Sequence, residues 1–110
     1  MNFERKPFTA ASLLAGWSVT IVRTTAKSIR INWNSPTSLL NSGIRFYVAL
    51  AKTTESSEPY GEIVAENVTS SEITELDEYT EYNVTVVAVD GNGMPFKSAE
   101  VSVRTDEGGE

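Results

Sequence analysis

Apolar and polar residues alternate along several short stretches of this chain, which is the pattern of half-buried β-strands. The clearest stretch is residues 76–89, in which every second residue after Tyr82 is apolar (Val84, Val86 and Ala88). A tyrosine at the start of such a strand can bury its ring and turn its hydroxyl back onto the backbone of the preceding corner. The stretch therefore predicts a core strand that the chain enters through a tight corner.

Six further stretches are predicted as strands: the segment between Gly16 and Thr24, residues 29–33, 44–52, 61–66 and 71–76, and the alternating residues Ala99, Val101 and Val103. Both faces of residues 44–52 are apolar, so the pattern does not choose the inward face. Residues 90–96 are rich in turn-forming residues and are predicted as a loop.

Seven short strands without a helical pattern predict an all-β fold, a seven-stranded antiparallel sandwich of two sheets. A small closed barrel is the alternative. The sandwich is favoured because Trp33 and Tyr82 are expected to be core anchors that face each other across two sheets.

The composition permits one globular core and removes most catalytic chemistry. The chain has 110 residues, 40% of them hydrophobic and 22% charged, and it contains neither cysteine nor histidine. Their absence excludes disulfides, thiol nucleophiles and the commonest transition-metal ligand. Carboxylates such as Asp77 and Glu81 are expected to be ordinary surface charge. We therefore expect no enzymatic activity, no cofactor and no metal.

The charge of the chain restricts its partners. A formal net charge of -6 and an isoelectric point near 4.6 disfavour binding to nucleic acid or anionic membranes, and no stretch has the length and apolarity of a membrane helix. Carboxylates without any Lys or Arg occupy positions 53–96: Glu55, Glu58, Glu62, Glu66, Glu72, Glu75, Asp77, Glu78, Glu81 and Asp90. We interpret them as a solubility device, and an acidic face for a basic partner or a neighbouring repeat is the alternative.

Three motifs resemble those of one known family. Trp33 with a proline three residues later resembles its second strand, and Leu76-x-x-x-Thr-x-Tyr82-x-Val resembles its corner and sixth strand. The run Val-x-Val-Arg-Thr that ends at Thr105 resembles its closing strand. In order and spacing these motifs are similar to the fibronectin type III domain, which makes Trp33, Leu76 and Tyr82 structural signature residues. The chain departs from the family at Glu78 and near Gly16, where proline is usual.

The resemblance implies an immunoglobulin-like fibronectin type III domain over residues 16–106, with an N-terminal linker at 1–15 and a C-terminal tail at 107–110. It implies a non-catalytic protein-interaction and spacer module, one of several tandem repeats in an extracellular or cell-surface adhesion or receptor-like protein. Its partner would be a protein or a neighbouring repeat, and the isolated domain would be monomeric. An accessory domain of a secreted enzyme and an intracellular muscle-type repeat are the alternatives.

Two loops of this topology are expected at the same end of the sandwich, and they carry large apolar residues: Leu39, Leu40, Met94 and Phe96. Loops rarely expose several such residues to water, so we predict a contact there with a partner or a preceding repeat. The alternative is that two or more of them fold inward and cap the core.

Two sequence motifs suggest carbohydrate attachment, and a third resembles a cation loop. Asn67 and Asn83 are each followed by Val-Thr and form acceptor sites for N-glycosylation. Asn83 alternates with buried residues and should face solvent. The segment Asp90-Gly-Asn-Gly lacks the later ligands of a calcium loop and is predicted as a turn.

Overall fold

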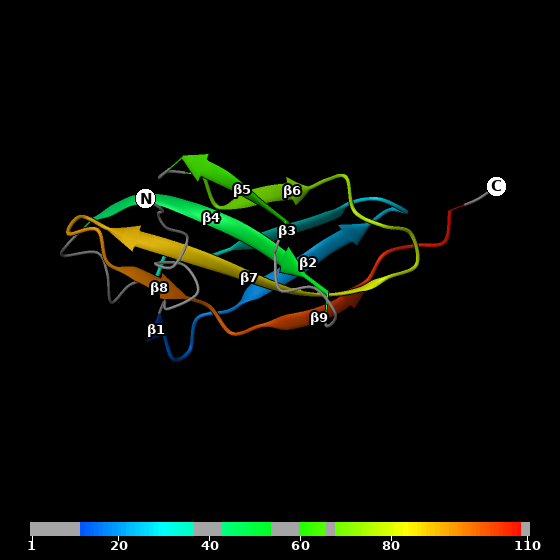
Figure 1. The fold of residues 1–110 in the computed structure, drawn as a ribbon. Helices are drawn as coiled ribbons and strands as arrows, with labels where there is room; N and C mark the ends of the chain where they lie inside the picture. Colours follow the sequence, from blue (N-terminus) through cyan, green and yellow to red (C-terminus); the bar gives the residue numbers. More distant parts are fainter. Residues whose placement is uncertain (1–11, 37–42, 54–59, 66–67, 109–110) are drawn as a thin grey trace, which may run out of the picture.

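The computed structural model describes residues 12–36, 43–53, 60–65 and 68–108, and these residues form two sheets packed face to face without a helix (Figure 1). The smaller sheet contains β2 (Val19–Thr24), β3 (Ile29–Trp33) and β6 (Ser70–Ile73). The larger sheet contains β1 (Ser12–Leu13), β4 (Ile44–Lys52), β5 (Tyr60–Ala65), β7 (Glu81–Asp90), β8 (Pro95–Lys97) and β9 (Val101–Arg104). The predicted two-sheet sandwich is confirmed.

The larger sheet runs in the order β1-β8-β7-β4-β5, with β9 also paired to β7. Every strand pair is antiparallel except β1 and β8, which are parallel. The closing strand is divided, because Ser98 and its neighbours interrupt it between β8 and β9. The division and the short β1 explain why the described residues show more strand segments than the seven predicted.

The boundaries of several predicted elements need correction. Pro95 and Phe96 belong to β8 and not to a loop, because the hairpin closes early and Pro95 pairs with Val89. The strand predicted at 71–76 ends at Ile73, so Leu76 lies beyond it, buried in the corner. Residues 12 and 13, which we expected in the linker, pair with β8 at the edge of the sheet.

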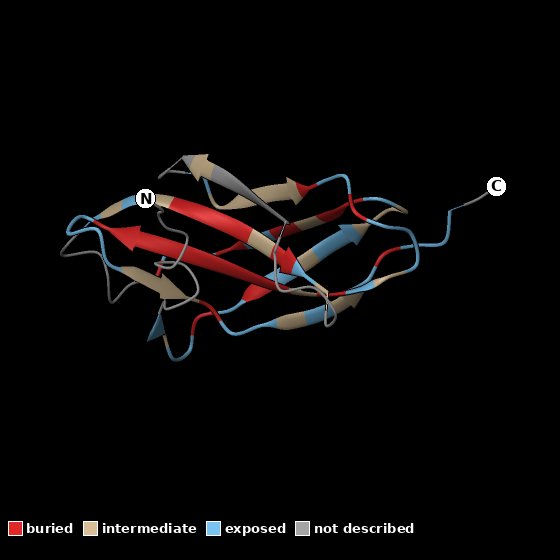
Figure 2. Cartoon of the chain, in the orientation of Figure 1, coloured by how far each residue is buried: buried red, intermediate tan, exposed pale blue. Residues whose placement is uncertain are grey.

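The core between the sheets is formed by the inward stripes of β3, β4 and β7 (Figure 2). On β4 the inward side is the one that carries Tyr47, a choice that the sequence pattern left open. The rings of Trp33 and Tyr47 meet edge to face with centroids 5.3 Å apart. Tyr82 is also buried in the sheet opposite Trp33, and the Trp33 ring packs against the ring of Tyr47.

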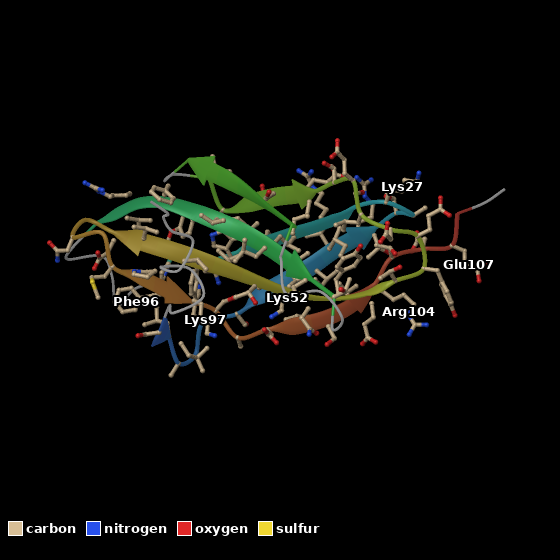
Figure 3. The ribbon with its side chains drawn as sticks, in the orientation of Figure 1. Lys27, Lys52, Phe96, Lys97, Arg104 and Glu107 are labelled. Atoms are coloured by element: carbon tan, nitrogen blue, oxygen red, sulfur yellow. The ribbon has the colours of Figure 1, made fainter. Side chains whose placement is uncertain are left out.

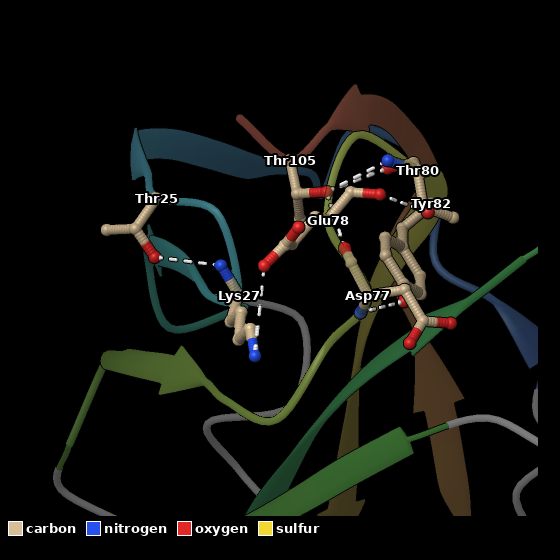
Figure 4. A network of polar contacts seen from close by, with 7 residues as sticks. All are labelled: Thr25, Lys27, Asp77, Glu78, Thr80, Tyr82 and Thr105. Atoms are coloured by element: carbon tan, nitrogen blue, oxygen red, sulfur yellow. Dashed lines mark hydrogen bonds and ion pairs between the residues drawn. The ribbon is translucent and has the colours of Figure 1, made fainter. Parts of the chain in front are cut away.

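The corner before β7 is held by hydrogen bonds from the side chains of Tyr82 and the distant Thr105 (Figure 4). The Tyr82 ring is fully buried, and its hydroxyl accepts the Asp77 N–H at 2.8 Å, as the tyrosine at the strand entry predicts. The Thr105 hydroxyl donates to the Asp77 carbonyl at 2.6 Å and accepts the Thr80 N–H at 2.9 Å. These bonds tie the end of β9 to the corner. Tyr79 bends the corner with a φ of 46°, in the left-handed region.

We expect the isosteric substitution Thr105→Val to lower the free energy of unfolding by about 2 kcal/mol, because it leaves the Asp77 carbonyl and the Thr80 N–H without their partner in a partly buried corner. Tyr82→Phe, which removes the acceptor of the Asp77 N–H, should cost about 1 kcal/mol. Urea unfolding measures both. The double variant should lose less than the sum, since both bonds hold Asp77.

The matched control is Thr20→Val on the exposed side of β2, which should change stability by less than about 0.5 kcal/mol. A Thr105→Val variant as stable as this control would contradict the account of the corner.

Candidate functional site

The candidate site is the end of the sandwich where β7 turns into β8, at the left of the view in Figure 1. The Gly91 N–H donates to the Gly43 carbonyl at 3.2 Å, which joins this turn to the chain that enters β4. Gly43, the last residue of the loop predicted at 34–43, therefore contacts the turn between β7 and β8.

The turn itself is organised by one carboxylate. Asp90 Oδ1 accepts the N–H groups of Asn92 and Met94, each at 2.9 Å, and the Asp90 N–H donates to the Met94 carbonyl at 3.0 Å. Gly93 takes a φ of 83°, which favours glycine. The carboxylate is thus engaged in holding the turn. Within the described residues, no group of three or more acidic, Cys or His side chains is placed to hold a metal ion.

The structure separates the residues predicted to form the contact surface. Met94 projects from the turn with 55% of its surface exposed. Phe96 is half-buried on β8 and packs against the core (Figure 3). Leu39 and Leu40 lie outside the described residues. Met94 is therefore available to a partner, Phe96 contributes mainly to the core, and the contact itself stays a prediction.

A shallow pocket of about 260 Å³ lies beside the segment that links β1 to β2. Its walls come from two segments: Leu14, Ala15, Gly16, Trp17 and Ser18, and Asn34, Ser35 and Pro36. Trp17 is buried, and its indole Nε1–H donates to the Asn34 carbonyl at 2.6 Å. The sequence pattern did not identify Trp17 as a core residue, because it stands before the alternation of β2 begins. Its bond fixes the approach of the chain to β2.

Ser98 is a second buried residue that the sequence pattern missed. Its hydroxyl accepts the Val86 N–H at 3.0 Å and donates to the Ala99 carbonyl at 3.1 Å, where β8 ends. The Ser98 N–H in turn donates to the Val86 carbonyl at 2.9 Å. A serine in a polar run carries no signal of burial, so this link between β7 and the divided closing strand could not be read from the pattern.

Asn83 lies on the outer side of β7, between Lys52 of β4 and Ser102 of β9. Its side chain is partly exposed, and its Oδ1 accepts the Ser102 hydroxyl at 2.8 Å. This bond uses the oxygen and not the nitrogen to which a glycan would be attached. Asn67 lies outside the described residues. Glycosylation of either residue stays a prediction.

The sequence matches the family model of the fibronectin type III domain over residues 15–104. A curated relative from Acropora millepora, "MAM and fibronectin type III domain-containing protein 1", is 41% identical over 98 residues. The match includes 89% of this chain and 23% of the relative, so the chain spans about a quarter of the relative's length.

Solved structures show the same fold. The fn3 domain of the human collagen alpha-1(XX) chain superposes with a TM-score of 0.75 at 16% identity, covering 92% of this chain and 89% of that domain. The FN5 domain of Drosophila Lar superposes with a TM-score of 0.66 at 24% identity, covering 90% of this chain and 100% of that domain.

The glycosylation prediction can be checked by expression in a eukaryotic secretory host followed by intact-mass measurement. We expect an added glycan mass that Asn83→Gln removes and that Thr85→Ser retains, because serine also completes the acceptor motif. Asn67→Gln reports separately on the other motif. An unmodified mass for the wild-type protein would remove this support for secretion.

Proposed function

Because the chain belongs to the fibronectin type III family, we propose that it is a non-catalytic protein-interaction and spacer module, one of several domains in an extracellular adhesion or receptor-type protein. The observation that carries this proposal is that the chain enters at one end of the sandwich and leaves at the other in a fixed direction. A domain with this geometry can be inserted in series with others.

The entry and the exit lie far apart along the molecule (Figure 1). The described chain begins at β1, beside Phe96 and Lys97 of β8. It leaves past β9 at the opposite end, where Figure 3 labels Arg104 and Glu107. The molecule measures 48 × 33 × 22 Å, so the two ends of the sandwich are separated along its long direction.

The exit is fixed by three hydrogen bonds to Asp106. Its N–H donates to the Thr25 carbonyl at 2.9 Å, and its carbonyl accepts the Tyr79 N–H at 3.0 Å. Its side-chain Oδ1 accepts the Thr24 hydroxyl at 2.7 Å. Together with the Thr105 bonds at the corner, these contacts orient the departing chain relative to the sheets, which is what a rigid spacer requires.

Both ends also expose large side chains that could contact neighbouring proteins. Met94 is exposed at the entry end. At the exit end Tyr79 is 58% exposed, and the guanidinium carbon of Arg104 lies 4.8 Å from the centre of its ring. Because the Tyr79 ring and the Arg104 guanidinium already contact each other, they present an apolar and a charged group to a partner. Little further side-chain entropy would be lost on binding. The placement favours contacts between successive domains.

The curated relative supports the part of the proposal that places this module among several domains. The name of the coral relative combines fibronectin type III with a second domain type, and this chain matches less than a quarter of its length. These findings do not favour an accessory domain of an enzyme or a muscle-type repeat. Among the described residues, no helix has the length and apolarity needed to cross a membrane.

The spacer proposal is tested by a spin-label distance measurement between Ser12→Cys and Glu107→Cys, since the chain has no other cysteine. We expect a narrow distance distribution. Asp106→Gly should broaden it, because it removes the bond to Thr24 and frees the backbone, whereas Asp106→Asn retains an oxygen acceptor and should leave it narrow. A wild-type distribution as broad as that of Asp106→Gly would overturn the proposal of a rigid spacer.

A further inference from the structure

The turn between β7 and β8 contains two residues with a side-chain carbonyl carbon that are each followed by glycine. They are Asp90, before Gly91, and Asn92, before Gly93. At such a step the next backbone nitrogen can approach the side-chain carbon closely, because glycine has no Cβ to block it. Asparagine is in addition one of the thermolabile residues of proteins. The turn therefore contains the elements of a covalent self-modification.

Of these two residues, Asn92 is the one open to attack. It lies in the exposed run of residues 91–94, at the left of the view in Figure 1. Its backbone N–H donates to Asp90 Oδ1 at 2.9 Å, but within the part of the chain that the structure describes no hydrogen bond holds its carboxamide. Both the side-chain carbonyl carbon and the surrounding water are thus available for reaction.

Asp90 is protected by its surroundings. It is 5% exposed, and its Oδ1 accepts the N–H groups of Asn92 and Met94 at 2.9 Å each. A carboxylate is also a poorer electrophile than a neutral carboxamide, because its negative charge repels a nucleophile. The residue that organises the turn is therefore stable, and its neighbour is the reactive one.

The other described asparagines lack the glycine. Asn32, Asn34 and Asn83 are followed by tryptophan, serine and valine respectively, so a Cβ hinders the approach of the next nitrogen in each case. The Asn83 side chain is also engaged, since its Oδ1 accepts the Ser102 hydroxyl at 2.8 Å. These three residues serve as internal references for the reactivity of Asn92.

The hydrogen bonds of Asp90 restrain the nucleophile. The Gly93 N–H donates to the Asp90 carbonyl at 2.9 Å, and the Asp90 N–H donates to the Met94 carbonyl at 3.0 Å. To attack, the Gly93 nitrogen must leave this bond, lose its proton and turn toward the Asn92 side chain. The turn must therefore open locally before reaction, and the Asp90 carboxylate, which accepts two N–H groups of the same turn, opposes that opening.

We propose that Asn92 is a deamidation site and that Asp90 controls its rate. The Gly93 nitrogen gives its proton to water and attacks the Asn92 side-chain carbonyl carbon. A carbon–nitrogen bond forms, the side-chain nitrogen takes up a proton and leaves as ammonia, and a cyclic succinimide results. One water molecule then opens the ring. Cleavage at the former side-chain carbonyl gives aspartate, and cleavage at the main-chain carbonyl gives isoaspartate.

The modification changes the entry end of the domain. Either product adds a negative charge two positions from Asp90, and isoaspartate also adds one carbon to the main chain inside the turn. The spacing between Asp90 and Met94, which their hydrogen bonds require, is then lost. Met94 is the exposed apolar residue of this end, so an aged chain presents a different surface. This inference is independent of the proposed spacer function.

Peptide mapping by mass spectrometry after prolonged incubation of the folded 110-residue chain at mildly alkaline pH tests the site. We expect aspartate and isoaspartate to accumulate at position 92, while Asn32, Asn34 and Asn83 stay intact over the same period. Asn92→Gln should remain unmodified, because its longer side chain would have to close a larger ring. Deamidation at position 92 no faster than at these three references would overturn the proposed site.

The role of Asp90 is tested by Asp90→Ala, which we expect to deamidate at position 92 about tenfold faster than the wild-type chain, because two hydrogen bonds to a carboxylate are lost. Glu100→Ala removes an exposed carboxylate outside the turn and should leave the rate unchanged. In concentrated urea the wild-type chain and Asp90→Ala should react equally fast, since neither forms the turn. Unaltered amide spectra of β3 and β7 would show that the variants stay folded. Equal rates for the folded wild-type and Asp90→Ala chains would overturn the control by Asp90.

Discussion

The hydroxyl of Thr105 is the contact on which the arrangement of this domain most depends. It donates to the Asp77 carbonyl and accepts the Thr80 N–H, so one buried side chain satisfies two backbone groups of a corner that is 25 or more positions away. Tyr82 satisfies a third group, the Asp77 N–H. Because unpaired polar groups are costly where water is partly excluded, these part-buried bonds stabilise the corner, the start of β7 and the end of β9 together. The same junction sets the direction in which the chain leaves at Asp106.

The general fold could be predicted because its strongest signals are local. The alternation after Tyr82 identifies a strand with one buried face. The position of the tyrosine at the start of that strand predicts the corner. The inward face of β4 could not be predicted, because Tyr47 and Val48 are both apolar and both buried. The deciding partner of Tyr47 is Trp33 in the other sheet, and alternation within one strand contains no information about a second sheet. Val48 belongs to a second apolar cluster with Val87 and Val89. Both sides of β4 are therefore apolar, and the sequence pattern cannot choose between them.

The candidate site was less predictable than the fold. The turn at Asp90 followed from its residue types, since a short carboxylate followed by two glycines favours local hydrogen bonding. Phe96 was expected in a loop, but a strand of three residues is too short to show alternation. Trp17 and Ser98 were missed for a related reason: each is buried through a bond to a distant backbone group, Asn34 or Val86. Burial of this kind depends on tertiary structure, and composition does not reveal it.

The most direct test of the central claim is native-state hydrogen exchange at the amides of Asp77, Thr80 and Thr105. Each donates within the junction, to the Tyr82 hydroxyl, the Thr105 hydroxyl and the Thr80 carbonyl respectively. If the junction holds the sandwich together, these amides should exchange only through global unfolding, with the same opening free energy as amides at the centre of β7. Exchange of the three amides through a local opening, at a clearly lower free energy than that of β7, would contradict the account.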